Sequence, residues 1–347
     1  MPISYLESHV HTADGYRLTL YRSPPRGPRR VDPEARPVLL LPGAGANRFT
    51  FGLRADRSLP AILNARGLDV WLAELRGARS SKTLSARRSE RPDVTLCLRL
   101  DHDLPAILAT IRSVTGAERV DLVGHSIGGL LAMLAAGGAL APYIGRVVTV
   151  SAPGTFRGFV GGDEPGRLVR SVARGVEALS GSFDRIVVSP WARTPGPIPH
   201  LRSFQRHVLP GALDASERRL YFDHCVEDLP SGDLGQIARW IRKGQLEDRY
   251  GRGLEHYLAA VRAPVLALAS PRDKVIPEAL VRAGFDRLGS DDKTLVLVCK
   301  DHGHSRDYAH ADILLARSAV ADVLEPMAAW LADALDVRSS RRSAASG

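Results

Sequence analysis

The sequence contains little cysteine, and its three cysteines are far apart. Cys97, Cys225 and Cys299 are odd in number and lack the paired spacing of a zinc site or a disulfide framework, so we expect free thiols in a reducing compartment. The N-terminus lacks the basic segment and apolar core of a secretion signal. No run approaches the roughly 18 apolar residues of a membrane span. These absences predict a cytoplasmic protein without a transmembrane segment.

Lysine is also scarce, with five lysines among 47 basic residues, and aromatic residues make up only 6% of the chain. The net charge of +9 therefore comes from arginines, which are spread along the whole sequence. A nucleic-acid-binding surface would need basic residues gathered on one face with aromatic residues between them, so this distribution argues against nucleic acid as a partner. Residues 338–347 have no apolar content that could dock on a core and are predicted to be disordered.

Short, continuous apolar runs alternate with amphipathic stretches of helical length. The chain opens with a predicted antiparallel hairpin, in which Ser8–Thr12 and Tyr16–Tyr21 flank an Asp-Gly turn. Later runs are typical of strands buried on both faces of a parallel sheet. They are Pro37–Gly43, Leu68–Leu75, Arg119–His125, Arg146–Ala152, Ala263–Ser270 and Lys293–Cys299, and helices are expected between most of them, for example over Asp103–Val114 and Pro277–Leu288. The pattern predicts an α/β protein with a doubly wound, mostly parallel sheet.

One gap breaks the alternation. About a hundred residues separate the strand ending at Ala152 from the strand beginning at Ala263, which is too long for a simple connection between neighbouring strands. We predict a discontinuous core, formed by residues 1–152 and 263–337, and a mainly helical cap inserted at residues 153–262.

The stretch VDLVGHSIGG places a serine at the corner between a buried strand and a helix of small residues. In a nucleophile elbow the serine backbone is strained, and the residues two before and two after it must be nearly without side chains. Gly124 and Gly128 meet that requirement around Ser126. The N-terminus of the following helix would present the Ile127 N–H to a developing oxyanion. A second N–H is expected from the loop LLLPGAGANRF, where Ala44 is the candidate.

A serine nucleophile needs a histidine base held by a carboxylate, in the chain order serine, acid, histidine for this architecture. Asp273 is the only acid immediately after the strand APVLALAS, and it would otherwise be an Asx-turn residue. Three histidines, His302, His304 and His310, follow the last strand, and spacing alone does not choose between the last two.

Three other polar or aromatic features have simpler structural interpretations. Asp101-His102-Asp103 resembles a metal cluster, but helix capping and the helix dipole explain acids at that position. Trp240 is expected to pack the cap. His125 is expected to support the core and to point away from the site of Ser126.

These motifs resemble the α/β-hydrolase superfamily, in particular its acid-lipase-like branch and bacterial relatives. SHVHTADGYRLTLYR resembles the opening hairpin of that branch, and GHSIGG resembles its elbow. LNARGLDVWLAELRGARSS resembles the branch's segment that contains an Arg-Gly pair. DYAHADILLARSAVADVLEPMAAWL resembles the family's Y-x-H-x-D segment and closing helix. The resemblance implies an α/β-hydrolase fold and assigns the base to His310, with His304 as the alternative. Pro42-Gly43 stands where the family often has His-Gly.

The residues and the resemblance together predict a serine hydrolase that uses Ser126, Asp273 and His310, with Ala44 and Ile127 as the oxyanion hole. The expected substrate is an acyl ester with a hydrophobic acyl part, and no cofactor or metal is required. Transfer of the acyl group to an alcohol or thiol, and a non-catalytic binding role, remain as alternatives. The sequence leaves the oligomeric state open.

Overall fold

The computed structural model describes residues 5–25, 35–84, 93–159, 167–180, 185–186 and 206–333. The predicted disordered tail, residues 338–347, lies outside them. Among the described residues a nine-stranded sheet has the order β1-β2-β4-β3-β6-β7-β10-β11, with β5 paired beside β2. The strands are β1 (Leu6–His11), β2 (Tyr16–Ser23), β3 (Val38–Leu41), β4 (Val70–Glu74), β5 (Lys82–Thr83), β6 (Val120–His125), β7 (Ile144–Val150), β10 (Val265–Ala269) and β11 (Lys293–Leu297).

The sheet is antiparallel at its N-terminal edge and parallel elsewhere, as the sequence predicts. β1 and β2 form the expected hairpin, and β2 runs antiparallel to β4, whereas β4, β3, β6, β7, β10 and β11 pair in parallel. All residues of β3, β4, β6 and β10 are buried, which explains why these strands appear as unbroken apolar runs.

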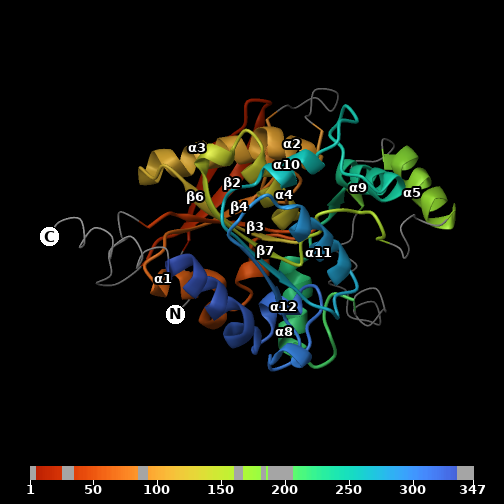
Figure 1. Ribbon diagram of the computed structural model, residues 1–347. Coiled ribbons are helices and arrows are strands. Elements are labelled where there is room, and N and C mark those ends of the chain that lie inside the picture. The colour runs from red at the N-terminus through yellow and green to blue at the C-terminus, as the bar shows by residue number, and fades with distance from the viewer. Residues whose placement is uncertain are drawn as a thin grey trace.

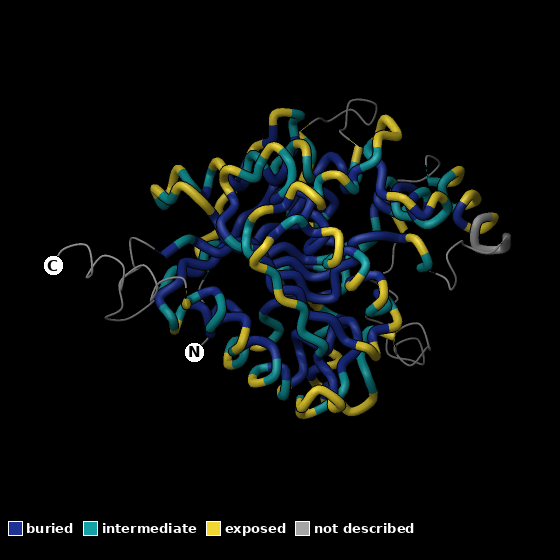
Figure 2. The backbone as a smooth tube through the Cα atoms, viewed as in Figure 1, coloured by how far each residue is buried: buried dark blue, intermediate teal, exposed yellow. Residues whose placement is uncertain are grey.

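Helices cover both faces of the sheet (Figure 1). One face packs against α3 (Leu104–Thr115), α4 (Ile127–Gly137) and α10 (Glu255–Ala260), and the other against α1 (Leu59–Ala65) and α12 (Asp312–Leu315). The remaining core helices are α2 (Leu96–Leu98), α11 (Glu278–Arg287) and a helix over residues 325–333, which packs on the same face as α1 and α12. Figure 2 shows the buried sheet between helices whose outer sides are exposed. The doubly wound α/β prediction is confirmed.

The described residues also form seven single turns. The 3-10 turns are η1 (Arg48–Phe51), η2 (Ala55–Arg57), η5 (Ala141–Tyr143) and η9 (Lys300–His302), and the wider π turns are η4 (Arg99–Asp103), η8 (Tyr221–Cys225) and η10 (Val320–Leu324). η4 joins α2 to α3 without a break.

The chain leaves the sheet after β7 and returns at β10, although these two strands pair directly. We call residues 153–262 the cap segment, and its boundaries remain a prediction. In the described residues it contains α5 (Arg167–Leu179), β8 (Arg185–Ile186), α8 (Ala215–Leu220), η8, β9 (Leu229–Pro230), α9 (Ser231–Lys243) and α10. α5 packs on α9 at the outer edge of the molecule (Figure 1).

Candidate active site

Ser126 lies between β6 and α4 in a strained backbone conformation. Its φ is 55° and its ψ is −124°, and only one other described non-glycine residue, Ser151, has a positive φ. The Ser126 N–H donates to Val150 O at 2.8 Å, which anchors the corner to the neighbouring strand β7. Strain of this kind costs energy and persists only where the surroundings impose it, so it is a feature expected of a functional residue.

The glycines on either side are required by close backbone packing. A Cβ placed on Gly124 would lie 2.4 Å from the Gly128 backbone, and a Cβ placed on Gly128 would lie 2.1 Å from Leu41 O. Neither position can hold a larger residue unless the backbone of β3 or α4 moves. The sequence prediction of why these two residues are glycine is therefore supported by their contacts.

Asp273 precedes β11 in the chain and His310 follows it, and the fold brings the two side chains together. Asp273 follows β10, and its Oδ2 lies 2.7 Å from His310 Nδ1. Its Oδ1 accepts the N–H groups of Val275 and Ile276 at 2.8 and 2.9 Å, so the carboxylate is also the Asx-turn residue that the sequence allowed. Burial opposes ionisation of Asp273, but the charge and hydrogen bond of His310 and the two N–H donors together lower its pKa below the ordinary value.

The backbone around His310 is held by several hydrogen bonds. Ser270 Oγ donates to Tyr308 O at 2.6 Å, and Ala309 N–H donates to the buried Asp312 carboxylate at 2.5 Å. Asp312 also accepts the N–H of Leu209 in the cap segment at 2.6 Å. Core and cap together therefore fix the segment that carries the imidazole.

His125 also contributes to this arrangement, and one part of its prediction is wrong. Its Nε2 lies 2.8 Å from His310 O, so this nitrogen carries the proton and donates to the carbonyl. The two rings pack with centroids 4.6 Å apart, and His125 lines the same cavity as Ser126 instead of pointing away from it. His125 lies two residues after Val123, which packs with Tyr308 and Ile313, so alternation along β6 directs its ring to the side of the sheet where His310 lies. Burial, followed by the charge of His310, lowers the pKa of His125 to about 3, which keeps the ring neutral.

Ala44 and Ile127 both line the cavity beside Ser126. Among the described residues, their backbone N–H groups donate to no protein acceptor. A Cβ placed on Gly43 would lie 3.0 Å from Ser126 Cβ, so the loop that carries Ala44 packs directly against the serine. Unused N–H donors beside a strained serine are suited to a negatively charged oxygen.

The cavity has a volume of about 310 Å³ and is lined mainly by apolar side chains. Core residues line it on one side, and the cap contributes Phe156, Phe159, Ile237 and Leu229. His207, also from the cap, lines the cavity with its ring centroid 6.0 Å from that of His310. No local pattern in the sequence indicates His207, because only the folded cap brings it there. One apolar cavity is thus lined by Ser126, His310, Ala44 and Ile127. Within the described residues, no hydrogen bond joins the Ser126 hydroxyl to His310.

The alternative histidines lie elsewhere. His304 Nδ1 bonds to Cys299 O at 3.2 Å, and His302 is exposed in η9. Neither residue is among those lining the cavity. Of the three candidates, only His310 contacts Asp273.

Asp103 shows a second error in the sequence interpretation. It does not cap a helix, because α2 and η4 continue directly into α3 and leave no free N-terminus there. Its carboxylate instead accepts the Arg76 N–H and guanidinium, each at 2.8 Å. Within the described ranges no group of three or more His, Cys, Asp or Glu side chains could hold a metal ion.

Trp240 and the cysteines match their predictions. Trp240 is buried against Phe156, with its indole N–H bonded to Glu247 O at 2.8 Å. All three cysteines are free and buried. In the part of the chain that the structure describes, no helix is both long and apolar enough to cross a membrane.

Comparisons with known proteins agree with this architecture. The model of the alpha/beta hydrolase family matches residues 38–323. Over 134 residues the chain is 34% identical to Lipase member N of Mus musculus, covering 37% of this chain and 34% of that protein. Over 132 residues it is 36% identical to the lysosomal acid lipase/cholesteryl ester hydrolase of Homo sapiens, covering 36% and 33%. The match thus spans about a third of the length of these curated relatives.

Solved structures resemble the fold over nearly the whole chain. A thermophilic esterase from Thermogutta terrifontis superposes with a TM-score of 0.62 at 16% identity, covering 94% of this chain and 98% of that one. A monoacylglycerol lipase from Paleococcus ferrophilus gives 0.59 at 17% identity, covering 90% and 98%. The family match extends across most of the sheet, both of its helical layers and the strained serine corner, and the chain therefore belongs to the alpha/beta hydrolase family.

Proposed function

We propose that the protein is a serine hydrolase that cleaves carboxylic esters through an acyl-enzyme on Ser126. One observation carries the proposal: a strained serine shares an apolar cavity with His310, which is itself bonded to the buried carboxylate of Asp273. The names of the relatives, which are lipases and esterases, support an ester substrate. The free, buried thiols support a cytoplasmic location, which we include in the proposal.

In the proposed acylation step each residue has a separate role. His310 Nδ1–H donates to Asp273, so Nε2 is unprotonated and accepts the hydroxyl proton of Ser126 as Oγ attacks the ester carbonyl carbon. The carbonyl electron pair moves onto oxygen, where the N–H groups of Ala44 and Ile127 stabilise the charge. The tetrahedral intermediate collapses, the alcohol leaves with the proton from His310 Nε2, and an acyl ester remains on Ser126.

Deacylation repeats these steps with water. His310 accepts a proton from water as its oxygen attacks the acyl carbon, and the second oxyanion occupies the same donors. Collapse breaks the bond to Ser126 Oγ, returns the proton to that oxygen and releases the carboxylic acid. The neutral ring of His125 adds no positive charge beside the imidazolium that forms in each half of the cycle.

The test is labelling and turnover. A fluorophosphonate probe should label the wild type at Ser126 and should not label Ser126→Ala, and the same substitution should abolish hydrolysis of p-nitrophenyl esters. Adding an acceptor alcohol and measuring the partition of acyl product distinguishes hydrolysis from acyl transfer. A wild type that neither labels nor turns over any ester refutes the proposal.

The cavity also predicts a limit on acyl length. A volume of about 310 Å³ equals that of roughly ten liquid water molecules, and a methylene group is similar in size to a water molecule. We expect kcat/KM to rise about fourfold per methylene until the chain reaches roughly eight to ten carbons, since each buried methylene contributes about 0.8 kcal/mol. The hexadecanoyl ester should then be a poorer substrate than the octanoyl ester, measured below the micelle concentration of each. Equal or rising kcat/KM up to sixteen carbons would contradict the size argument.

A further inference from the structure

The loop that carries Ala44 is packed between the catalytic serine and the cap. We call residues 42–47 the oxyanion loop. On the core side, the backbone at Gly43 contacts Ser126, as the 3.0 Å distance from a Cβ built there shows. On the cap side, a Cβ built on Gly45 would lie 2.7 Å from Leu229 Cδ2. The position of this loop is therefore set from both sides.

Three hydrogen bonds join the oxyanion loop to the cap residues 224–230, which we call the cap strap. Glu227 N–H donates to Gly45 O at 2.9 Å. The side-chain amide of Asn47 donates to Glu227 Oε1 at 2.8 Å and to His224 O at 2.6 Å. Asn47 is only 5% exposed, and its own Oδ1 accepts Phe49 N–H at the start of η1. One buried side chain thus supplies two of the three connections.

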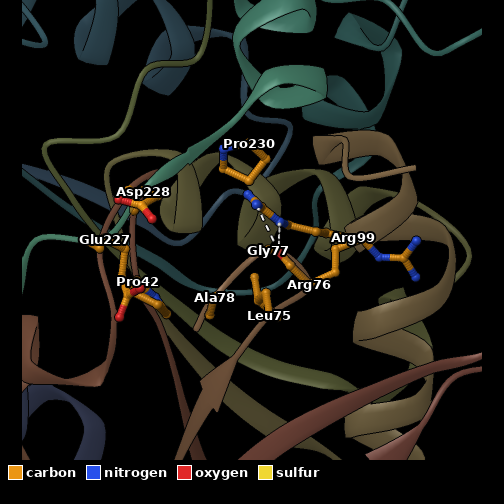
Figure 3. Close-up of a pocket in the computed structure, with 12 residues that line it drawn as sticks. Pro42, Leu75, Arg76, Gly77, Ala78, Arg99, Glu227, Asp228 and Pro230 are labelled. Carbon is orange, nitrogen blue, oxygen red and sulfur yellow. Dashed lines mark hydrogen bonds between the residues drawn. The ribbon is translucent and has the colours of Figure 1, made fainter. Parts of the chain in front are cut away.

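The cap strap is itself anchored to the core at its other end. Pro230 lies against Gly77, and α9 begins at the next residue. The Arg99 guanidinium donates to Arg76 O at 3.0 and 3.2 Å and pairs with the buried Asp233 of α9. Figure 3 shows Glu227 and Asp228 of the strap beside Pro42, and the bonds from Arg99 to Arg76. The strap is therefore a fixed support for the oxyanion loop.

We propose that Asn47 is a positioning residue, which holds the oxyanion loop against the cap strap so that the Ala44 N–H points to the oxyanion formed on Ser126. The inference rests on the proposed function. Two glycines give the loop wide backbone freedom, so its own sequence does not fix the direction of the Ala44 N–H. A donor stabilises the oxyanion only when it lies at about 2.7–3.1 Å from that oxygen.

The expected effect is on the transition state and not on substrate binding. Loss of one oxyanion donor lowers kcat by about 10²–10³-fold in other serine enzymes, so displacement of the Ala44 N–H in Asn47→Ala should lower kcat by about 10–100-fold. KM should change less than threefold. Binding of a trifluoromethyl ketone, whose adduct with Ser126 carries an oxyanion, should weaken by the same factor as kcat, whereas binding of the matched methyl ketone should not.

Asn64→Ala is the matched control. The Asn64 amide also donates to two backbone carbonyls, Ser23 O at 2.7 Å and Leu68 O at 3.0 Å, but it joins β2 to α1 and does not line the cavity. Both variants should lose comparable thermal stability, and only Asn47→Ala should lose kcat and ketone affinity. Asn47→Ser is uncharged and keeps an N-cap acceptor for the Phe49 N–H while removing the amide that donates to Glu227 and His224, so it tests the inference if the alanine variant does not fold.

The outcomes separate this inference from the proposed function. A wild type that binds the trifluoromethyl ketone and hydrolyses esters, together with an Asn47 variant as active as Asn64→Ala, overturns the positioning role alone. A wild type with neither property overturns the proposed function. A parallel rise in KM and in both ketone dissociation constants would show a general distortion of the cavity and would also overturn the positioning role.

Discussion

Replacement of Asp273 by Asn should inactivate the enzyme by placing the proton on the wrong nitrogen of His310. In the wild type, Oδ1 accepts two backbone N–H groups and Oδ2 accepts the proton of His310 Nδ1. An asparagine has one acceptor oxygen and one NH2 group in these two places. If the NH2 group faced Val275 and Ile276, four buried donors would confront each other without an acceptor.

The magnitude follows from those two hydrogen bonds. Leaving a buried donor unsatisfied costs about 1–3 kcal/mol, so the unfavourable orientation costs about 2–6 kcal/mol for two donors. The amide oxygen therefore stays on the backbone N–H groups, and the NH2 group donates to His310 Nδ1. The proton of the imidazole then resides on Nε2, which cannot accept the Ser126 proton. A preference of that size lowers the productive tautomer, and with it kcat/KM, by roughly 30-fold to 10⁴-fold.

Two measurements check this reasoning. Steady-state hydrolysis of p-nitrophenyl butyrate at neutral pH gives kcat/KM, and nitrogen NMR of labelled histidine reports which ring nitrogen carries the proton. Asp301→Asn, at an exposed position after β11, is the control and should be fully active. An Asp273→Asn variant within tenfold of wild type, or one whose His310 still carries its proton on Nδ1, would refute the argument.

Three further predictions concern the elbow, the interior and the choice of base. Gly128→Ala should prevent folding or lower the melting temperature strongly in thermal denaturation, since its Cβ would lie 2.1 Å from Leu41 O; a fully stable, active variant would contradict the packing argument. Glu74 is 2% exposed, and burial outweighs Arg48 to raise its pKa from 4.5 to about 7. Because the folded state holds this proton more tightly, wild-type stability should fall as pH rises from about 4.5 to about 7, whereas Glu74→Gln should lose that dependence and be more stable by about 3 kcal/mol above pH 7 in urea titrations. His310→Ala should lose nearly all esterase activity and His304→Ala should keep most of it, and the opposite result would reverse the assignment of the base.

The sequence by itself was enough to locate the main strands and the serine corner. Runs such as Val38–Leu41 and Val265–Ala269 are buried on both faces, so their apolar character is continuous and local. Gly124 indicates the elbow for a similar reason, since its steric demand comes from Gly128, four residues further on, whereas the demand at Gly128 comes from Leu41 O of the distant strand β3. Asp273 could be chosen because it was the only acid directly after its strand.

The tertiary structure decided what depends on contacts between distant residues. His310 meets Asp273 across 37 residues and Asn47 meets Glu227 across 180, and no local pattern encodes either pair. The orientation predicted for His125 and the capping role predicted for Asp103 are wrong for one reason: each was drawn from neighbouring residues alone, whereas the two side chains bond to His310 and to Arg76. The burial of a strand depends on the hydrophobicity of neighbouring residues and can be predicted from them. The pairing of distant polar groups depends on the packing of separate segments and is decided only in the folded protein.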